Sequence, residues 1–518
     1  MSTQLFSTQR GDRESNRIRL RDILPQAQVV GADEIFFHSC CGVWRDCQSD
    51  DLFVAIVDAD EDGHEFTQEA IARGASAVVT ERLLTTRRPQ CIVPDTREAY
   101  GLICQALAGH PSQRLATIAV SGTDGKTVTS HLIRQVLQMA NVDAGLASSI
   151  EVNFGAGKKS VPPKQLNSPQ LAQQLTQMAL ANCHTAVFEV SSIALAKRSL
   201  AGVDLDIAVL TNIRQGTPGF HGSPKNYRRA ILRLLDHLKP GGVVAVNADD
   251  PTCHFLLKAI DQPTLTFGMK QEANVTGVLI ERTPSEQTFL IKAGSDSVPV
   301  KTAIVGDQHI LNCLAAAAVG LAQGIDLVTI ASGLGQVDAI PGRLERVECG
   351  QDFGVWIDSA KSPSQLATAV RTIKQITQGK LWCVASISDD QTVEMRNRMG
   401  EVLERAADRC VLTKNALEQV IDYEPMHQVL DGFESPGGAE LIPNRFRAIE
   451  WVLQRAKPGD AVLITGCGEQ PFALVGDENW TIGDRDVCEA WLYDNASLSP
   501  IDVNLGDGPD TFHIDDYR

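Results

Sequence analysis

The chain has 518 residues, of which 43% are hydrophobic and 21% charged, and its formal net charge at pH 7 is −17. That length suggests two to four domains, and the acidic balance argues against a nucleic-acid partner. No apolar run approaches the roughly 18 residues of a membrane span, and the polar N-terminus has no apolar signal core. We therefore expect a cytoplasmic protein without a membrane span. The 13 cysteines form no C-x-x-C pair and are expected to be reduced, mostly buried thiols; adjacent Cys40 and Cys41 have no partner at metal-ligand spacing.

Short apolar strands alternate with helical patterns along the chain, which predicts an α/β fold with mainly parallel sheets. The first part has predicted strands at 51–55, 76–80 and 91–95 and a helix at 66–74. Residues 109–112, Gly-His-Pro-Ser, are typical of a linker.

Two further α/β units follow. The predicted strands of the second unit are 117–120, 186–190, 207–212 and 243–247, with a small β insertion in 262–302 and an alanine-rich helix at 311–321. The third unit begins near residue 341, and its predicted strands are 354–358, 381–386, 409–413 and 460–465. The predicted domains are therefore 1–112, 113–340 and 341–495, followed by an acidic tail, 496–518, whose residues 502–518 are expected to be loosely ordered.

A glycine-rich loop at the start of the second unit carries the strongest chemical signal. An apolar run ends at Val120, and a helical pattern follows Lys126 and Thr127. Backbone N–H groups of such a loop hold phosphate oxygens, the lysine adds a positive charge, and the threonine hydroxyl can bind Mg²⁺. The loop is a shorter form of the usual phosphate-binding pattern, with these residues: Gly122, Thr123, Asp124, Gly125, Lys126 and Thr127. It predicts ATP binding on a central P-loop-type parallel sheet.

Several other stretches appear in one order along residues 20–475. They are Glu189-Val190-Ser191-Ser192, Thr211-Asn212, Asn247-Ala248-Asp249-Asp250-Pro251, Asn312, Gly342-Arg343-Leu344-Glu345 and Asp358-Ser359-Ala360. With the glycine-rich loop, this ordered set resembles the Mur ligases, which use ATP to add amino acids to the peptidoglycan precursor. Within the family it looks most like the ligase that adds the third residue to UDP-N-acetylmuramoyl-alanyl-glutamate. The resemblance implies a UDP-substrate domain, a central ATP-binding domain and a Rossmann-like C-terminal domain.

The resemblance also implies roles for individual residues. Lys126 would grip the β- and γ-phosphates, while Thr127 and Glu189 would hold Mg²⁺. Asn312 would contact adenine, and Arg343 and Asp358 would reach ATP from the third domain. The catalytic set would be Lys126, Glu189 and His221, and the substrate-binding set would be Arg45, Ser168, Ser191 and Arg198. The partners implied are a UDP-N-acetylmuramoyl-peptide precursor and an amino acid, and we expect a monomer.

The chain departs from the family pattern at positions close to the chemistry. Ile193 stands where the family has histidine, Thr217 where a histidine helps bind a second magnesium, and Ile231 where a lysine is carbamoylated. The diaminopimelate-recognising arginine motif aligns near Lys414-Asn415-Ala416-Leu417, which has no arginine. Further altered stretches are Arg214-Gln215-Gly216, Ser359-Ala360-Lys361, 385–390 and Gly466-Cys467-Gly468-Glu469-Gln470. Several lost electrostatic contacts, each typically worth about 10²–10³ in rate, should slow the reaction.

These observations leave alternative functions open. The first is an ATP-dependent amide ligase of the Mur type with altered amino-acid choice. The second is a pseudoenzyme that binds ATP or a UDP-precursor and regulates wall synthesis, which the three substitutions favour. Folylpolyglutamate-type ligation leaves the UDP-like domain unexplained, and a different P-loop ATPase is the remaining alternative.

Overall fold

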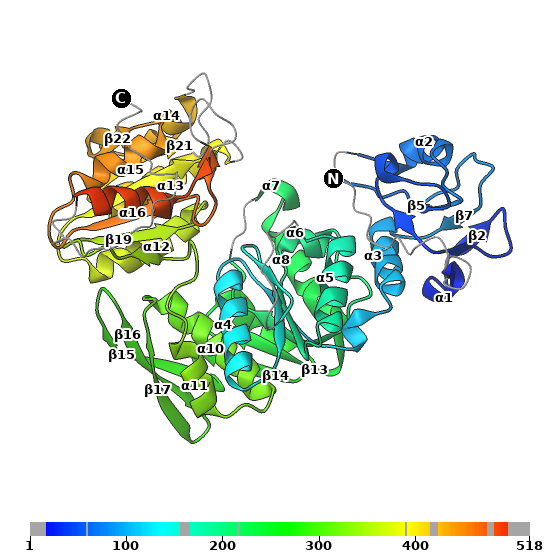
Figure 1. Cartoon of the computed structure of the whole chain (residues 1–518), viewed down its shortest axis with the longest axis horizontal. Helices are drawn as coiled ribbons and strands as arrows, with labels where there is room; N and C mark the ends of the chain where they lie inside the picture. Colours follow the sequence, from blue (N-terminus) through cyan, green and yellow to red (C-terminus); the bar gives the residue numbers. More distant parts are fainter. Residues whose placement is uncertain are drawn as a thin grey trace, which may run out of the picture. The chain divides into compact units, whose positions relative to one another are not determined.

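The computed structural model describes residues 17–58, 61–155, 166–214, 218–388, 391–414, 423–473 and 481–495. The chain divides into two compact units, 1–340 and 341–518 (Figure 1). The predicted acidic tail, 496–518, lies outside the described residues.

 Within the described residues, no helix is both long enough and apolar enough to cross a bilayer.

The first unit begins with a small α/β layer. Its five-stranded sheet has the order β2-β7-β6-β5-β4, with parallel pairing except between β2 and β7. The strands are β2 (Gln28–Val30), β4 (Cys40–Cys41), β5 (Leu52–Val54), β6 (Ala77–Thr80) and β7 (Gln90–Ile92), and a short ribbon joins β1 (Ile18–Arg19) to β3 (Phe36–Phe37). The helices are α1 (Leu20–Ile23), α2 (Thr67–Ala72) and α3 (Thr96–Leu107).

A ten-stranded sheet forms the centre of the first unit. Its order is β10-β9-β11-β8-β12-β13-β14-β15-β16-β17, and the strands from β9 to β15 pair in parallel. The strands are β8 (Ala116–Ser121), β9 (Ala144–Ala147), β10 (Val152–Asn153), β11 (Thr185–Glu189), β12 (Leu205–Leu210), β13 (Leu238–Asn247), β14 (Thr264–Gly268), β15 (Val275–Arg282), β16 (Gln287–Ala293) and β17 (Asp296–Thr302). The predicted β insertion at 262–302 thus extends the central sheet, because β14 pairs with β13 and the antiparallel strands β15–β17 follow it.

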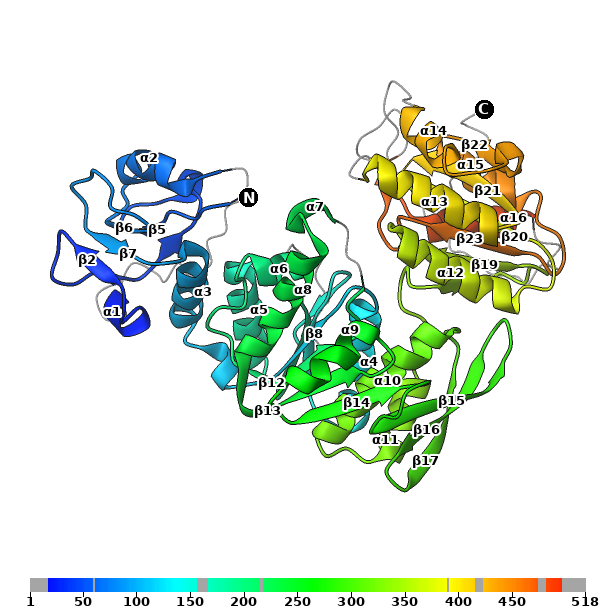
Figure 2. The same cartoon turned by 180° about the vertical axis from the view of Figure 1, so that it is seen from behind.

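Helices cover both faces of this sheet (Figures 1 and 2). They are α4 (Lys126–Met139), α5 (Ser168–Leu180), α6 (Ser192–Ala196), α7 (Pro218–His221), α8 (Pro224–Leu232), α9 (Pro251–Leu256), α10 (Asp307–Ala322) and α11 (Leu327–Gly335). Side chains of a strand alternate between the two faces: Ile118 and Val120 of β8 join the core with α4, α10 and α11, whereas Ala119 joins the core with α5, α6 and α8. Residues 111–113, next to the predicted linker, form a 3₁₀ turn in which Pro111 is buried.

The second unit is a separate three-layer α/β fold. Its six-stranded sheet has the order β18-β19-β23-β20-β21-β22 and is parallel except for β18. The strands are β18 (Glu345–Val347), β19 (Gly354–Asp358), β20 (Leu381–Ile387), β21 (Arg409–Lys414), β22 (Ala439–Leu441) and β23 (Ala461–Thr465), with a ribbon of β24 (Phe472–Ala473) and β25 (Thr481–Ile482). The helices are α12 (Pro363–Ile376), α13 (Val393–Ala406), α14 (Glu424–Leu430), α15 (Arg445–Leu453) and α16 (Asp484–Asn495). The predicted α/β class with mainly parallel sheets is confirmed.

Candidate active site

The glycine-rich loop connects the end of β8 to the start of α4, as the sequence predicted. Gly122 has φ +144° and Gly125 has φ +85°, a region that side chains rarely adopt. A Cβ on Gly122 would lie 2.1 Å from Thr211 Oγ1, so the loop also requires glycine for close packing. Lys126 Nζ donates to the carbonyl oxygens of Gly122 at 2.9 Å and Thr123 at 3.0 Å, which holds its charge over the loop.

Three oxygen-bearing side chains meet beside the first turn of α4. The hydroxyl of Thr127 donates to Glu189 Oε2 at 2.8 Å and lies 3.1 Å from the hydroxyl oxygen of Ser149. Glu189 ends β11, which is the parallel neighbour of β8, and Ser149 follows β9, the next strand in the sheet. Ser149 is absent from the predicted site, although the two serines that follow the short apolar strand β9 were the signal that could have found it.

The end of β12 fixes the conformation of the loop from the other side. Asn212 Oδ1 accepts from the backbone N–H of Asp124 at 3.0 Å, and Asn212 Nδ2 donates to the Asp124 carbonyl at 3.0 Å. Thr211 Oγ1 donates to the same carbonyl at 2.7 Å. These hydrogen bonds give the Thr211-Asn212 pair of the predicted motif set a structural role, because they fix the backbone conformation of the loop.

Asn312, the predicted adenine contact, lies on α10 directly beside the loop. Its side chain is 4% exposed, and its Oδ1 accepts from Gln308 Nε2 at 3.3 Å. A Cβ on Gly125 would lie 2.4 Å from that Oδ1, so the amide and the loop backbone are in close approach. The structure therefore brings Asn312 and the predicted phosphate-binding residues together in one place.

His221, at the end of α7, is connected to the loop through other side chains. Its Nε2 lies 3.0 Å from Ser192 Oγ, and its ring lies edge-on to Tyr227 with centroids 5.3 Å apart. The Tyr227 hydroxyl is 2.7 Å from Thr123 Oγ1 in the loop. Burial lowers the pKa of His221 below its ordinary value, so its imidazole is neutral at pH 7.

Two of the three substituted positions are described by the structure. Ile231 lies on α8, is fully buried, and packs in the core cluster shared with α5 and α6. Ile193 is partly buried in the first turn of α6. Thr217 lies outside the described residues. The position of the family's carbamoylated lysine is thus occupied by packed hydrocarbon.

The four predicted substrate-binding residues have different surroundings. Arg198 has φ +58°, and its guanidinium lies 3.5 Å from Asp95 and 3.8 Å from Glu98 at the start of α3. Ser191 caps α6 by accepting from the N–H of Ala194, and Ser168 is buried at the first position of α5. Arg45 stacks over the ring of Trp44, with its guanidinium carbon 4.7 Å from the ring centroid.

Arg343 and Asp358 lie in the second unit. The Asp358 carboxylate accepts from the N–H groups of Leu344 and Ala360, both at 2.9 Å. Arg343 donates to Ser359 Oγ and lies 3.4 Å from Glu469 Oε2. Asp358 therefore holds the backbone next to Arg343. Lys414 is buried at the end of β21, and the aligned residues 415–417 lie outside the described residues.

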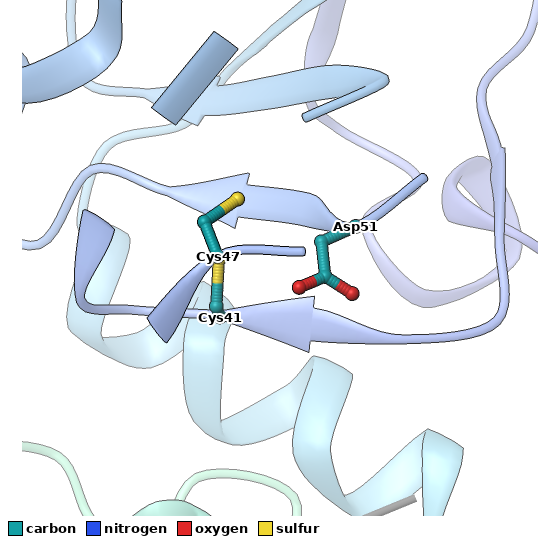
Figure 3. Close-up of side chains that lie close together, drawn as sticks. All are labelled: Cys41, Cys47 and Asp51. Carbon is teal, nitrogen blue, oxygen red and sulfur yellow. The ribbon is translucent and has the colours of Figure 1, made fainter. Parts of the chain in front are cut away.

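Cys41, Cys47 and Asp51 form a separate buried cluster in the first sheet (Figure 3). One ligand-type atom from each lies within 4.8 Å of the others. The Asp51 carboxylate accepts from Ser39 Oγ and, at 2.8 Å, from the N–H of Gln48, which closes the loop before β5. Hydrogen bonding to Cys47 and burial raise the pKa of Cys41, which keeps this thiol protonated. Structural zinc sites use four ligands, and these three residues are better explained as loop packing.

Comparison with known proteins places this site in a family. Residues 120–320 match the Mur ligase middle domain, and residues 342–468 match the Mur ligase glutamate ligase domain. The chain is 33% identical over 460 residues to the UDP-N-acetylmuramoyl-L-alanyl-D-glutamate--2,6-diaminopimelate ligase of Geobacillus kaustophilus (strain HTA426), covering 86% of this chain and 93% of that relative. It is 31% identical over 449 residues to the UDP-N-acetylmuramyl-tripeptide synthetase of Roseiflexus sp. (strain RS-1), covering 82% and 88%.

A solved structure of a UDP-N-acetylmuramoyl-L-alanyl-D-glutamate--2,6-diaminopimelate ligase has the same fold, with a TM-score of 0.66 at 24% identity over 92% of this chain and 99% of that one. The two relatives above 30% identity are named as a ligase and a synthetase, which favours the ligase prediction over the pseudoenzyme alternative. The sequence identity and coverage together establish that the chain belongs to the Mur ligase family of ATP-dependent ligases.

Proposed function

We propose that this chain adds an amino acid to a UDP-N-acetylmuramoyl-dipeptide, using ATP to activate a carboxylate of the precursor. The observation that carries the proposal is the 2.8 Å contact between Thr127 and Glu189, placed beside the glycine-rich loop. The hydroxyl in the first turn of α4 and the carboxylate at the end of β11 converge there, at the helix N-terminus that would receive phosphate.

The donor set at this position suits Mg²⁺. Thr127, Glu189 and Ser149 offer only oxygen atoms, which are the ligands that this hard cation prefers. When bound, Mg²⁺ would offset the negative charge of the ATP phosphates. In this proposal Thr127 and Glu189 hold the ion, and Lys126 binds the β- and γ-phosphates.

The reaction would proceed in two displacements. A carboxylate oxygen of the precursor attacks the γ-phosphorus of ATP, and the bond to ADP breaks to leave an acyl phosphate. The amino-acid nitrogen then attacks the acyl carbon, loses a proton, and displaces phosphate to form the amide. Both steps depend on positioning and charge stabilisation, and the loop, Asn312 and His221 are the chain's own groups for that task.

The identity of the amino acid is a separate part of the proposal. The Geobacillus relative is named for 2,6-diaminopimelate, whereas the aligned stretch here, 414–417, has no arginine. We propose that the chain selects a different amino acid, or binds diaminopimelate through other residues. We further propose that it acts in the cytoplasm, since none of its described cysteines forms a disulfide. We also propose that it is a monomer, and light scattering of the purified protein tests the oligomeric state.

The test is phosphate release by the purified full chain with UDP-N-acetylmuramoyl-alanyl-glutamate, ATP, Mg²⁺ and a panel of amino acids that includes diaminopimelate and lysine. We expect release that depends on both the precursor and one amino acid, with the tripeptide product found by mass spectrometry. Lys126→Ala and Glu189→Gln should abolish it. Lys292→Ala, which removes an exposed lysine of β16, should retain it. Release no greater than that of Lys126→Ala with every amino acid would overturn the proposal.

A further inference from the structure

The phosphate loop of this chain contains a carboxylate. Asp124 lies between Thr123 and Gly125, and its side chain is only 13% exposed. A negative charge among the backbone N–H groups of such a loop repels the negative charges of a triphosphate, and partial burial strengthens the repulsion by reducing solvent screening. A loop with this residue therefore needs a compensating positive charge close by.

Arg214 supplies a positive charge at that place. Its guanidinium nitrogen Nη1 lies 3.5 Å from Asp124 Oδ2, and Nη2 lies 3.5 Å from Gln308 Oε1 on α10. The side chain of Arg214 thus spans the loop from Asp124 toward the helix that carries Asn312. Because Asp124 and Arg214 are 90 residues apart in the sequence, only the folded chain brings them together.

The backbone of Arg214 is fixed to the same loop. Its N–H donates to Thr123 Oγ1 at 3.0 Å, and two residues earlier the carbonyl of Asn212 accepts from the N–H of Thr123 at 2.9 Å. The backbone of Arg214 is therefore held in place, whereas its side chain is 39% exposed and can move toward a bound ligand.

We propose that Arg214 is a positioning residue that neutralises Asp124 and thereby allows the loop to accept the triphosphate of ATP. The inference rests on the proposed use of this loop for ATP. Lys126 Nζ donates to the carbonyl oxygens of Gly122 and Thr123, whereas the guanidinium of Arg214 lies against the Asp124 carboxylate. The charges of Asp124 and Arg214 act as one unit. Removing the arginine charge lowers nucleotide affinity, and removing the aspartate charge raises it.

The test measures binding of the ATP analogue AMP-PNP with Mg²⁺ to the full chain by calorimetry, without precursor or amino acid. Arg214→Ala should raise the dissociation constant on the order of tenfold, because the carboxylate then loses the guanidinium beside it. Arg214→Lys, which keeps the charge, should recover most of the loss. Asp124→Asn should bind the analogue several-fold more tightly. The double variant Arg214→Ala/Asp124→Asn should return to within about threefold of the wild type, and uncharged adenosine should bind Arg214→Ala and wild type equally.

Arg228→Ala is the matched control, because Arg228 is an exposed arginine on α8 and its loss changes net charge by the same amount. It should leave the dissociation constant unchanged. The inference is wrong if Arg214→Ala binds as the wild type does, or if the double variant binds as weakly as Arg214→Ala. If the wild type binds no nucleotide, both the inference and the proposed function fail, whereas normal wild-type binding with no effect of Arg214→Ala overturns the inference alone.

Discussion

Arg445 donates through Nε and Nη2 to the two carboxylate oxygens of Asp484, each at 2.6 Å, and both side chains are fully buried. The pair joins the starts of α15 and α16 in the second unit, and Arg445 Nη2 also donates to the carbonyl of Thr465 at 3.0 Å. Burial alone would lower the pKa of Arg445, but the charge of Asp484 and its hydrogen bonds raise it above its ordinary value. The guanidinium is therefore charged in the core.

Removing one partner of this pair should destabilise the second unit strongly. Asp484→Ala leaves a buried, uncompensated guanidinium, for which the expected loss is about 3–5 kcal/mol in the free energy of unfolding. The double variant Arg445→Met/Asp484→Leu, which removes both charges, should lose much less. Arg398→Ala breaks the exposed pair with Glu394 and should cost at most about 0.5 kcal/mol. Urea unfolding measures all three, and equal losses for the single and double variants would contradict the assignment.

Ile231 offers a test of how far this site has diverged from the family pattern. Ile231→Lys would place an ammonium group in the apolar core beneath α8, at a fully buried position. We expect a loss of about 3 kcal/mol or more in the free energy of unfolding and no gain in ligation when bicarbonate is added. Arg228→Lys on the exposed side of the same helix should change stability by less than about 0.5 kcal/mol. A stable Ile231→Lys protein with bicarbonate-dependent activity would contradict this expectation, since it would show that the core at this position accommodates a carbamoylated lysine.

The sequence predicted the central part of this site well because the signals there are local. A strand, two glycines and Lys126-Thr127 at a helix start are adjacent in the chain, and Glu189 ends a run of apolar residues. Parallel strands bring their carboxyl ends to one edge of a sheet, so neighbouring strands in the fold place these residues together. The same logic, applied to the unpredicted strand β9, would have added Ser149.

Contacts between distant side chains could not be predicted. Arg214 meets Asp124 only because β12 pairs with β8, and His221 at the end of α7 meets Ser192 at the start of α6 only in the folded chain. Arg445 and Asp484 each begin a helix and have the sequence appearance of solvated charges, yet packing of α15 against α16 buries both. Sequence patterns indicate which face of a helix or strand is buried, whereas ion pairs between distant residues depend on how the helices and strands pack together.

His309 gives the first unit a predictable response to acid. It is 4% exposed on α10, and burial lowers its pKa to about 3. An unfolded histidine has a pKa of about 6.5, so below that pH the unfolded chain binds a proton that the folded chain does not. The stability present above pH 6.5 is therefore lost as the pH falls toward 3, by up to about 1.4 kcal/mol per pH unit from this group.

His309→Leu should remove that contribution. Between pH 5.5 and 4.5 the wild type should lose about 1.4 kcal/mol more unfolding free energy than the variant. His254→Leu, at an exposed histidine of the same unit, should keep the wild-type pH dependence. Urea unfolding at each pH measures the difference, and parallel pH profiles for wild type and His309→Leu would exclude a neutral buried imidazole.

Substitution of Gly125 in the glycine-rich loop, compared with that of Gly324, distinguishes the effect of backbone strain from that of steric contact. Gly125→Ala places a methyl group at φ +85° and 2.4 Å from Asn312 Oδ1, so the loop or Asn312 must move. Gly324→Ala in the same unit has a similar φ of +77°, but its Cβ would meet no atom within 4 Å. Both variants should lose about 1 kcal/mol from left-handed backbone strain. Only Gly125→Ala should weaken ATP binding, on the order of a hundredfold, which calorimetry measures. Equal ATP affinity in the two variants would mean that the close approach of loop and amide is not needed for binding.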